Sequence, residues 1–116
     1  MSPKAPKAHA RLSDEALDLV ARRFKALSDA SRLKVCRELM DGECSVGELV
    51  ERTGLTQSNV SRHLGLLRDE GIVARRADGQ RAFYSIVDPS ISRICETVCE
   101  RLGEQVGERA RSLRPG

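Results

Sequence analysis

The spacing of apolar residues changes twice along this chain. Apolar positions recur with a helical period up to about residue 70, alternate with polar positions between residues 72 and 86, and return to a helical period from residue 89. A period near 3.6 predicts amphipathic helices, and a period of two predicts strands. The pattern therefore predicts a mainly α-helical domain with a small β-hairpin, an α+β protein in which a long helix follows the hairpin.

Residues suited to helix ends mark the limits of the predicted helices. A side-chain oxygen just before a helix accepts a hydrogen bond from a free backbone amide of the first turn. Ser45 and Glu48 have the spacing of a capping box, and Pro89 suits the first position of the last helix. The second helix is expected between Asp29 and Asp41. The other expected helices start after the caps Ser13, Ser45, Thr56 and Asp88.

The third and fourth predicted helices are joined by a tight turn at Gly54. In the fourth helix Val60, Leu64 and Leu67 fall on one stripe, and the opposite face carries short hydrogen-bonding side chains and an arginine. Such a pair is a helix-turn-helix pattern, and its polar face suits phosphates and base edges in a major groove. An amphipathic helix with a solvated face is the alternative. The expected DNA contacts here are Gln57, Ser58, Asn59, Ser61, Arg62 and His63.

The alternating segments, residues 72–76 and 81–86, predict two antiparallel strands. Asp78-Gly79 between them is a strong hairpin-turn signal, because the glycine takes the positive φ that the turn requires. A hairpin of this kind after a helix-turn-helix is a wing, and basic groups at its tip suit phosphates or a minor groove. Solvated arginines without a DNA partner are the alternative. The expected contacts are Arg75, Arg76, Gln80 and Arg81.

The first and last predicted helices each carry an apolar face. A long helix with one continuous apolar stripe needs a partner, and the first helix and a second subunit are the candidates. We therefore expect a homodimer. The stripes are Leu17, Val20, Phe24 and Leu27 in the first helix, and Ile91, Ile94, Cys95, Val98, Leu102 and Val106 in the last.

Composition narrows the class of protein. The length of 116 residues suits one domain, and an aromatic content of 3% leaves the core to aliphatic side chains. A net charge of +3 permits a polyanionic partner.

The chain has neither an apolar run that could span a membrane nor a signal peptide, so we expect a cytoplasmic protein with no membrane partner. The expected boundaries are a flexible basic tail over 1–11, the domain over 12–108 and a flexible tail over 109–116.

Four cysteines carry the candidate chemistry, as reduced thiols, metal ligands or redox switches. Cys95 and Cys99 lie one helical turn apart, which suits two thiolates that chelate As(III), Sb(III) or another soft ion. The alternative for Cys95 is a small buried hydrophobe. Cys36 is expected in the core, and Cys44 is expected to be exposed and reactive. Either is a candidate third ligand, and no cofactor is expected to be required for folding.

Taken together, the chain resembles the ArsR-type family of winged-helix repressors, which sense arsenic and zinc. The resemblance covers residues 21–102. It implies a homodimer with the first and fifth helices at the interface, and a repressor that leaves an inverted-repeat DNA operator when an inducer binds. Its carriers are residues 26–33, 45–49, 60–64 with Leu67, 71–73, and 79–81 with Phe83-Tyr84.

The sensor sites of that family match this chain only in part. Residues 45–47 stand where the family's arsenic motif has Cys-Val-Cys, and Cys44 lies one place earlier. The branch that senses sulfide and oxidants pairs a cysteine of the second helix with one near the end of the fifth. Cys36 and Cys99 are near those positions. The interhelical zinc site is matched at Asp88 and Glu104, but Ser90 and Arg101 occupy its histidine positions.

The sequence thus predicts a dimeric DNA-binding repressor, not an enzyme, that is released when a thiol-seeking inducer binds its cysteines. One alternative keeps this fold and makes the switch a disulfide or polysulfide link between the second and fifth helices, formed by an oxidant. A second alternative is a winged-helix protein-interaction module that does not bind DNA. The sequence has no phosphate-binding glycine loop, which argues against an enzyme.

Overall fold

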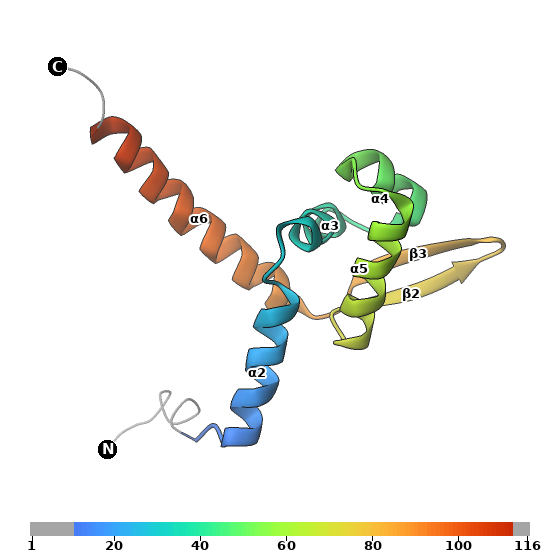
Figure 1. The fold of residues 1–116 in the computed structure, drawn as a ribbon, viewed down its shortest axis with the longest axis horizontal. Coiled ribbons are helices and arrows are strands. Elements are labelled where there is room, and N and C mark those ends of the chain that lie inside the picture. The colour runs from blue at the N-terminus through green and yellow to red at the C-terminus, as the bar shows by residue number, and fades with distance from the viewer. Residues whose placement is uncertain (1–10, 113–116) are drawn as a thin grey trace.

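A computed structural model of the chain describes residues 11–112, and side chains as far as residue 109 (Figure 1). The predicted N-terminal tail, apart from Arg11, lies outside the described residues, as do residues 113–116. The helices are α2 (Asp14–Ala26), α3 (Ala30–Met40), α4 (Val46–Thr53), α5 (Gln57–Asp69) and α6 (Pro89–Ser112). The strands are β1 (Cys44–Ser45), β2 (Val73–Asp78) and β3 (Arg81–Ile86).

The predicted helices and hairpin are confirmed, and α6 continues past Glu108, where the domain was expected to end. β1 was not predicted, because two residues are too short to show an alternating pattern. The three strands form an antiparallel sheet in the order β1-β3-β2, in which Cys44 pairs with Tyr84 and Ser45 with Phe83. The sheet therefore joins the wing to the segment that starts α4.

The expected caps are in place. The hydroxyl of Ser13 accepts a hydrogen bond from the amide of Ala16 at 3.0 Å. Ser45 and Glu48 form both bonds of the capping box, at 3.2 and 2.8 Å. Thr56 caps α5 through the amide of Asn59, and Asp88 accepts from the amide of Ser90 at the start of α6. Gly54 ends α4 with φ 75°, which turns the chain directly into α5.

The core lies under α5 and holds it against α3, α4 and β2. The predicted stripe of Val60, Leu64 and Leu67 is at most 1% exposed, so the opposite side of α5 faces solvent. Aliphatic side chains supply most of this core, as the low aromatic content requires. Its other large members include Val35, Leu39, Leu49, Ile72 and Ile91.

The expectation that His63 contacts DNA is wrong, because this side chain is buried and only 2% exposed. His63 follows Val60 by three residues and precedes Leu67 by four, so it lies on the apolar stripe of α5. Its Nδ1 has no hydrogen-bond partner among the described residues. Burial lowers the pKa of His63, Arg62 and Arg32 lower it further, and only Asp29 opposes them.

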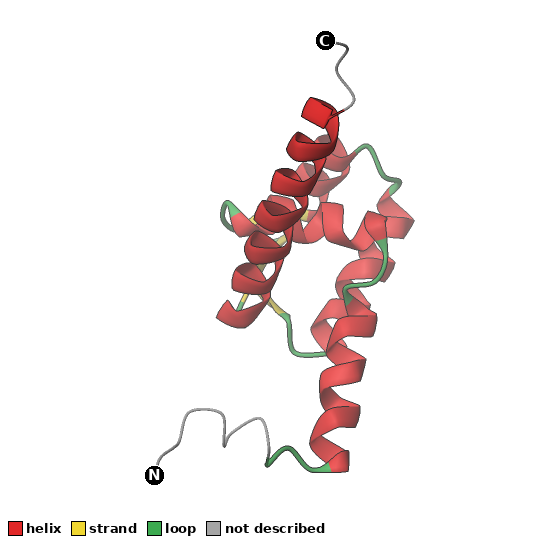
Figure 2. Cartoon of the chain, turned by 90° about the vertical axis from the view of Figure 1, so that its left-hand side faces the viewer, coloured by secondary structure: helices red, strands yellow, loops and turns green. Residues whose placement is uncertain are grey.

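Helices α2 and α6 diverge from the rest of the domain (Figures 1 and 2). The radius of gyration is 17.9 Å, against about 13 Å for a compact domain of this length. Much of their predicted apolar stripes is exposed, with Phe24 at 53% and Leu102 at 53%. Ile91 at the start of α6 is buried in the core, but among the described residues nothing covers the outer parts of these two faces. No helix among residues 11–112 is both long enough and apolar enough to cross a bilayer.

Shortening a buried side chain of α5 should destabilise the domain. We expect Leu67→Ala to lower the free energy of unfolding by about 2–5 kcal/mol, because it removes methyl groups from a fully buried site and leaves a cavity. Leu66→Ala is the matched control on the same helix, since Leu66 is 37% exposed. Urea denaturation measures both, and equal losses would contradict the assigned orientation of α5.

Acid should destabilise the domain through His63. Its pKa is lowered in the folded chain, so below about pH 6.5 the unfolded chain binds more protons and stability falls as the pH decreases. One histidine gives a slope of at most about 1.4 kcal/mol per pH unit. Urea denaturation between about pH 7 and pH 5 measures it. His63→Gln should lose this component, and an unchanged slope in that variant would disprove the assignment.

Candidate nucleic-acid interface and cysteine groove

The outer face of α5 presents the polar side chains that the sequence predicted there. Gln57, Ser58, Ser61 and Arg62 are exposed, and Asn59 is half-buried. Arg62 donates a hydrogen bond to Oδ1 of Asn59 at 3.1 Å, which orients the guanidinium along the helix surface. The first turn holds no acidic residue. Over residues 57–68 this face therefore offers donors and a positive charge, and no carboxylate that would repel a phosphate occurs before Asp69.

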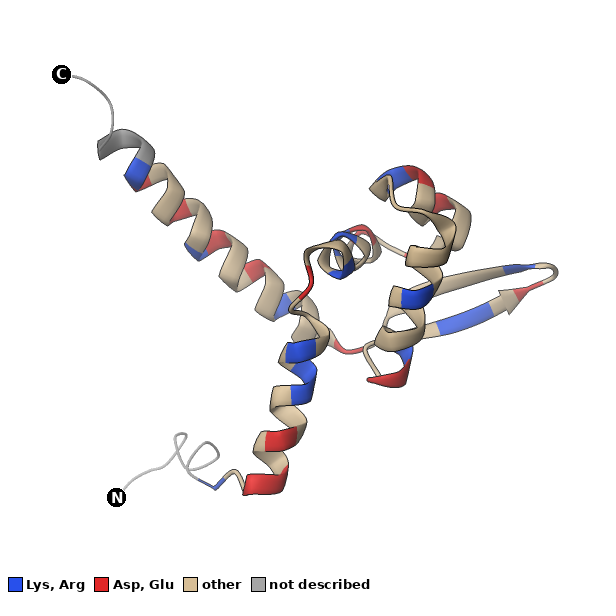
Figure 3. Cartoon of the chain, in the orientation of Figure 1, with Lys and Arg blue, Asp and Glu red and all other residues tan. Residues whose placement is uncertain are grey.

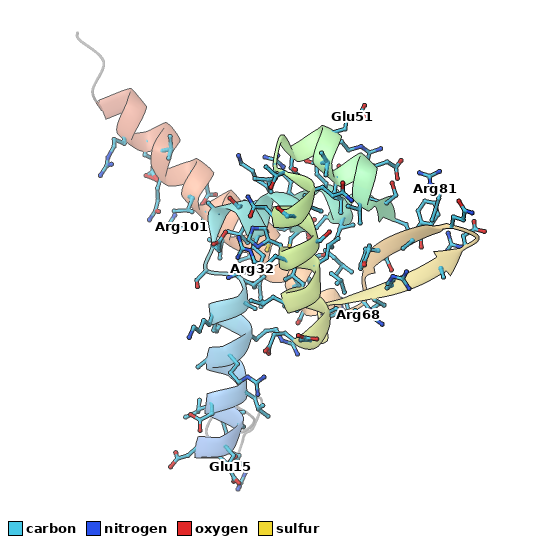
Figure 4. The ribbon with its side chains drawn as sticks, turned by 45° about the vertical axis from the view of Figure 1, so that its right-hand side comes forward. Glu15, Arg32, Glu51, Arg68, Arg81 and Arg101 are labelled. Atoms are coloured by element: carbon cyan, nitrogen blue, oxygen red, sulfur yellow. The ribbon has the colours of Figure 1, made fainter. Side chains whose placement is uncertain are left out.

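Arg68, which was not among the predicted contacts, is exposed near the C-terminal end of the same helix (Figure 4). It follows Ser61 by seven residues, a spacing of nearly two helical turns. That spacing was visible in the sequence and could have identified Arg68 as a further cation on this side of α5.

The hairpin of β2 and β3 projects beside α5, with basic residues along it (Figures 1 and 3). Its turn contains Gly79, with φ 63°. Arg75 and Arg76 project from opposite faces because consecutive residues of a strand alternate. All four residues predicted to contact DNA here are exposed, but Arg76 also binds Glu43 and Arg81 also donates to Ser45. The four predicted wing residues thus lie on one hairpin. Two of them, Arg76 and Arg81, also bind the segment that leads into α4.

The cysteines divide into a buried set and an accessible set, all as free thiols. Cys36 is 1% exposed, Cys95 is half-buried and Cys99 is exposed. Burial, and then the neighbouring charge of Cys95, raise the pKa of Cys36 to about 11. Burial and then Cys99 raise the pKa of Cys95. Cys95 of α6 packs against the core that contains Cys36 of α3.

The expectation that Cys44 is exposed and reactive is wrong. Its side chain is 0% exposed, because β1 pairs with β3 and places this residue against the core. Arg52 donates a hydrogen bond to its Sγ at 3.2 Å. Burial raises the pKa of the thiol and outweighs the opposite effect of Arg52. Cys44 is therefore a core residue.

Cys95 and Cys99 both line an apolar groove of about 620 Å³ between α2, α3 and α6. Lys34, Arg37 and Glu96 supply the charged groups of its lining. Two thiols in an open apolar groove can take a soft ion or electrophile. The apolar residues of the groove include Phe24, Leu27, Leu33, Met40, Ile94 and Val98.

No ready-made polydentate metal site occurs in the described part of the chain: three or more His, Cys, Asp or Glu side chains do not gather there. The residues that match the family's interhelical zinc site have other partners. Asp88 pairs with Arg23 and accepts from Ser90, and Glu104 pairs with Arg101 at 3.4 Å. In the described residues these two acids are therefore paired with arginines.

Comparisons with known proteins agree with this architecture. Residues 29–75 match the family described as bacterial regulatory protein, arsR family. A probable mercury resistance operon repressor of Streptomyces lividans is 43% identical over 75 residues, which are 65% of this chain and 60% of that protein. The HTH-type transcriptional regulator Rv0081 of Mycobacterium tuberculosis is 35% identical over 102 residues, or 87% of this chain and 90% of the relative.

Solved structures show the same fold. The crystal structure of Rv0081 has a TM-score of 0.74 at 35% identity and covers 84% of this chain and 99% of that one. The homodimeric winged helix-turn-helix DNA-binding domain of Mb0332 from Mycobacterium bovis has a TM-score of 0.73 at 29% identity, with coverage of 91% and 93%. The chain is therefore a winged helix-turn-helix transcriptional regulator rather than an enzyme, and it belongs to the ArsR family of bacterial regulatory proteins.

Proposed function

We propose that this protein is a homodimeric repressor that binds an inverted-repeat operator through α5 and the wing. The observation that carries the proposal is the exposed outer face of α5, which has no acidic residue before Asp69 at its end and is held outward by a fully buried stripe. Ser61 and Arg62 can reach base edges and phosphates in a major groove, and Arg75 and Gln80 can reach the backbone or minor groove beside it. A chromosomal target places this action in the cytoplasm.

The exposed apolar faces of α2 and α6 support the dimer. A second copy that packs against both faces would cover Phe24, Val98 and Leu102, which water surrounds in the single chain. A two-fold axis also places two recognition helices about one DNA turn apart. The homodimeric state of the M. bovis domain, which has the same fold, is consistent with this arrangement.

For the inducer, we propose a soft ion such as As(III), Sb(III) or another thiophilic metal, bound by Cys95 and Cys99. In the single chain Cys99 is exposed and Cys95 lies one turn away in the same groove, so an ion can reach the pair where the second copy does not cover this surface. A mercury-resistance repressor among the relatives gives independent support for a soft-metal inducer. Because the groove lies between α2, α3 and α6, an ion bound there acts on the helices proposed to hold the dimer together.

The second candidate is a thiol-redox or sulfane-sulfur switch on the same fold. It is favoured by the packing of Cys95 against the core that contains Cys36, which places cysteines of α3 and α6 in one region of the fold. Intact-protein mass spectrometry distinguishes the two after exposure to As(III) and, separately, to polysulfide. A mass increase equal to bound arsenic supports the first candidate. Loss of two hydrogens, or added sulfur, supports the second.

Removing the polar groups of α5 should weaken DNA binding without affecting the dimer. The test duplex is selected from a random pool by the wild-type protein. We expect Arg62→Ala and Ser61→Ala to reduce affinity for it, by about tenfold for Arg62, because a specific contact contributes about 1–3 kcal/mol. Gel shifts measure affinity, and analytical ultracentrifugation measures the dimer. Arg101→Ala on α6 is the matched charge control, and unchanged binding by Arg62→Ala would count against the assigned face.

Removing both groove thiols should abolish the response and leave DNA binding intact. Cys95→Ser/Cys99→Ser should bind the same duplex as the wild type and stay bound when As(III) or Sb(III) is added, since an alcohol is a poor ligand for soft ions. Cys44→Ala is the matched control, because Cys44 is buried outside the groove, and it should still respond. Full release of the double variant by both ions would eliminate the pair as sensor.

A further inference from the structure

The outer face of the small sheet carries an arginine–phenylalanine–arginine stack. Arg76 of β2 pairs in register with Phe83 of β3, so their side chains share one face. The guanidinium carbon of Arg76 lies 4.9 Å from the centre of the Phe83 ring, and that of Arg81 lies 5.0 Å from it. Both distances suit a cation–π interaction. The stack therefore ties the two wing strands together through their side chains.

Arg76 is also held by carboxylates. Its Nε and Nη2 donate to the two carboxylate oxygens of Glu43 at 3.0 and 2.9 Å, a bidentate pair. Its Nη1 lies 3.8 Å from the carboxylate of Asp78. The hydrogen bond from Arg76 lowers the pKa of Glu43, so this acid stays ionised at neutral pH. The charge of Arg76 is thus compensated by the protein itself.

Arg81 extends the same contact to α4. Its Nη2 donates to Oγ of Ser45 at 3.3 Å, and Ser45 is the N-cap of α4. Glu43 precedes Ser45 by two residues, so both partners belong to the segment that leads into α4. We call Glu43, Arg76, Arg81 and Phe83 the wing staple, because together they attach the hairpin to the helix-turn-helix.

We propose that the wing staple sets the angle of the hairpin relative to α5, and that Arg76 and Glu43 are positioning residues for DNA binding rather than a phosphate contact and an incidental surface acid. Arg75 then supplies the phosphate contact of β2. It lies on the other face of the strand, which packs onto the core at Val73. This inference rests on the proposed DNA binding and assigns roles within it.

Glu43 provides the sharpest test, because the two interpretations predict opposite signs. A carboxylate beside the wing repels DNA, so neutralising an incidental acid should strengthen binding. If Glu43 positions the wing, Glu43→Gln should weaken binding to the selected duplex by about fivefold, the effect of losing a bidentate ion pair and part of a cation–π contact. Glu51→Gln is the matched control, because Glu51 is an exposed acid on α4 (Figure 4). It should leave affinity unchanged or slightly raised.

The salt dependence of binding separates positioning from phosphate contact. Each phosphate neutralised contributes about 0.9 to the slope of log K against log salt concentration. Arg75→Gln should reduce that slope by about 0.9 per subunit. Arg76→Gln should weaken affinity with a clearly smaller change in slope, and Glu43→Gln/Arg76→Gln should be no weaker than Arg76→Gln alone. Equal slope losses for Arg75→Gln and Arg76→Gln would overturn the assignment.

A variant of Phe83 separates loss of the wing staple from loss of folding. Phe83→Leu keeps an apolar side chain and removes the ring, so it should weaken binding to a similar extent while urea denaturation shows a folded domain. Tighter binding by Glu43→Gln, with normal binding by the wild type, would overturn the wing staple alone. If the wild type bound no duplex at any salt concentration, the proposed function would fail, and the roles assigned to the wing would fail with it.

Discussion

Burial of one stripe of α5 is the interaction on which the DNA-binding surface depends. Val60, Leu64 and Leu67 are each worth about 1.5–3 kcal/mol when removed from water, and all three are at most 1% exposed. Rotating the helix by half a turn would expose them and bury Arg62, an unpaired charge. The same burial that stabilises the domain therefore directs Ser61 and Arg62 outward. Substitutions in this core act on recognition without touching DNA.

The remaining apolar surface is arranged for a different task. In α3, α4 and α5 the stripes face one another, but in α2 and α6 they face a groove and solvent. In a monomer, exposing Leu102 and Val106 to water is unfavourable. In a dimer the second copy would cover these side chains. Cys95 and Cys99 lie on this surface, so a change at sulfur acts where subunits would meet rather than at α5. In the proposed repressor, regulation and recognition would thus occupy separate parts of one small domain.

A feature could be predicted from the sequence when the residues that produce it lie close together along the chain. Caps such as Ser13 and the box of Ser45 with Glu48 involve residues within one turn, and helical stripes involve a few turns, so both were predicted correctly. Cys44 was assigned wrongly because its burial depends on pairing with Tyr84, and the bond between Arg76 and Glu43 spans 33 positions. The burial of His63, by contrast, had a local signal in its spacing from Val60 and Leu67, as the missed Arg68 had in its spacing from Ser61.

Cys36, Cys95 and Cys99 differ in solvent exposure, and this difference sets the order in which a thiol-seeking reagent can reach them. Thiolate, not thiol, is the nucleophile and the soft ligand. Cys36 is buried with its pKa raised to about 11, Cys95 is half-buried with its pKa also raised, and Cys99 is open to solvent. In the proposed mechanism a soft ion that reaches the groove meets Cys99 first, and its positive charge favours the thiolate form of the neighbouring Cys95. Ligation of Cys95 would then couple the bound ion to the packing of α2, α3 and α6, which together line the groove.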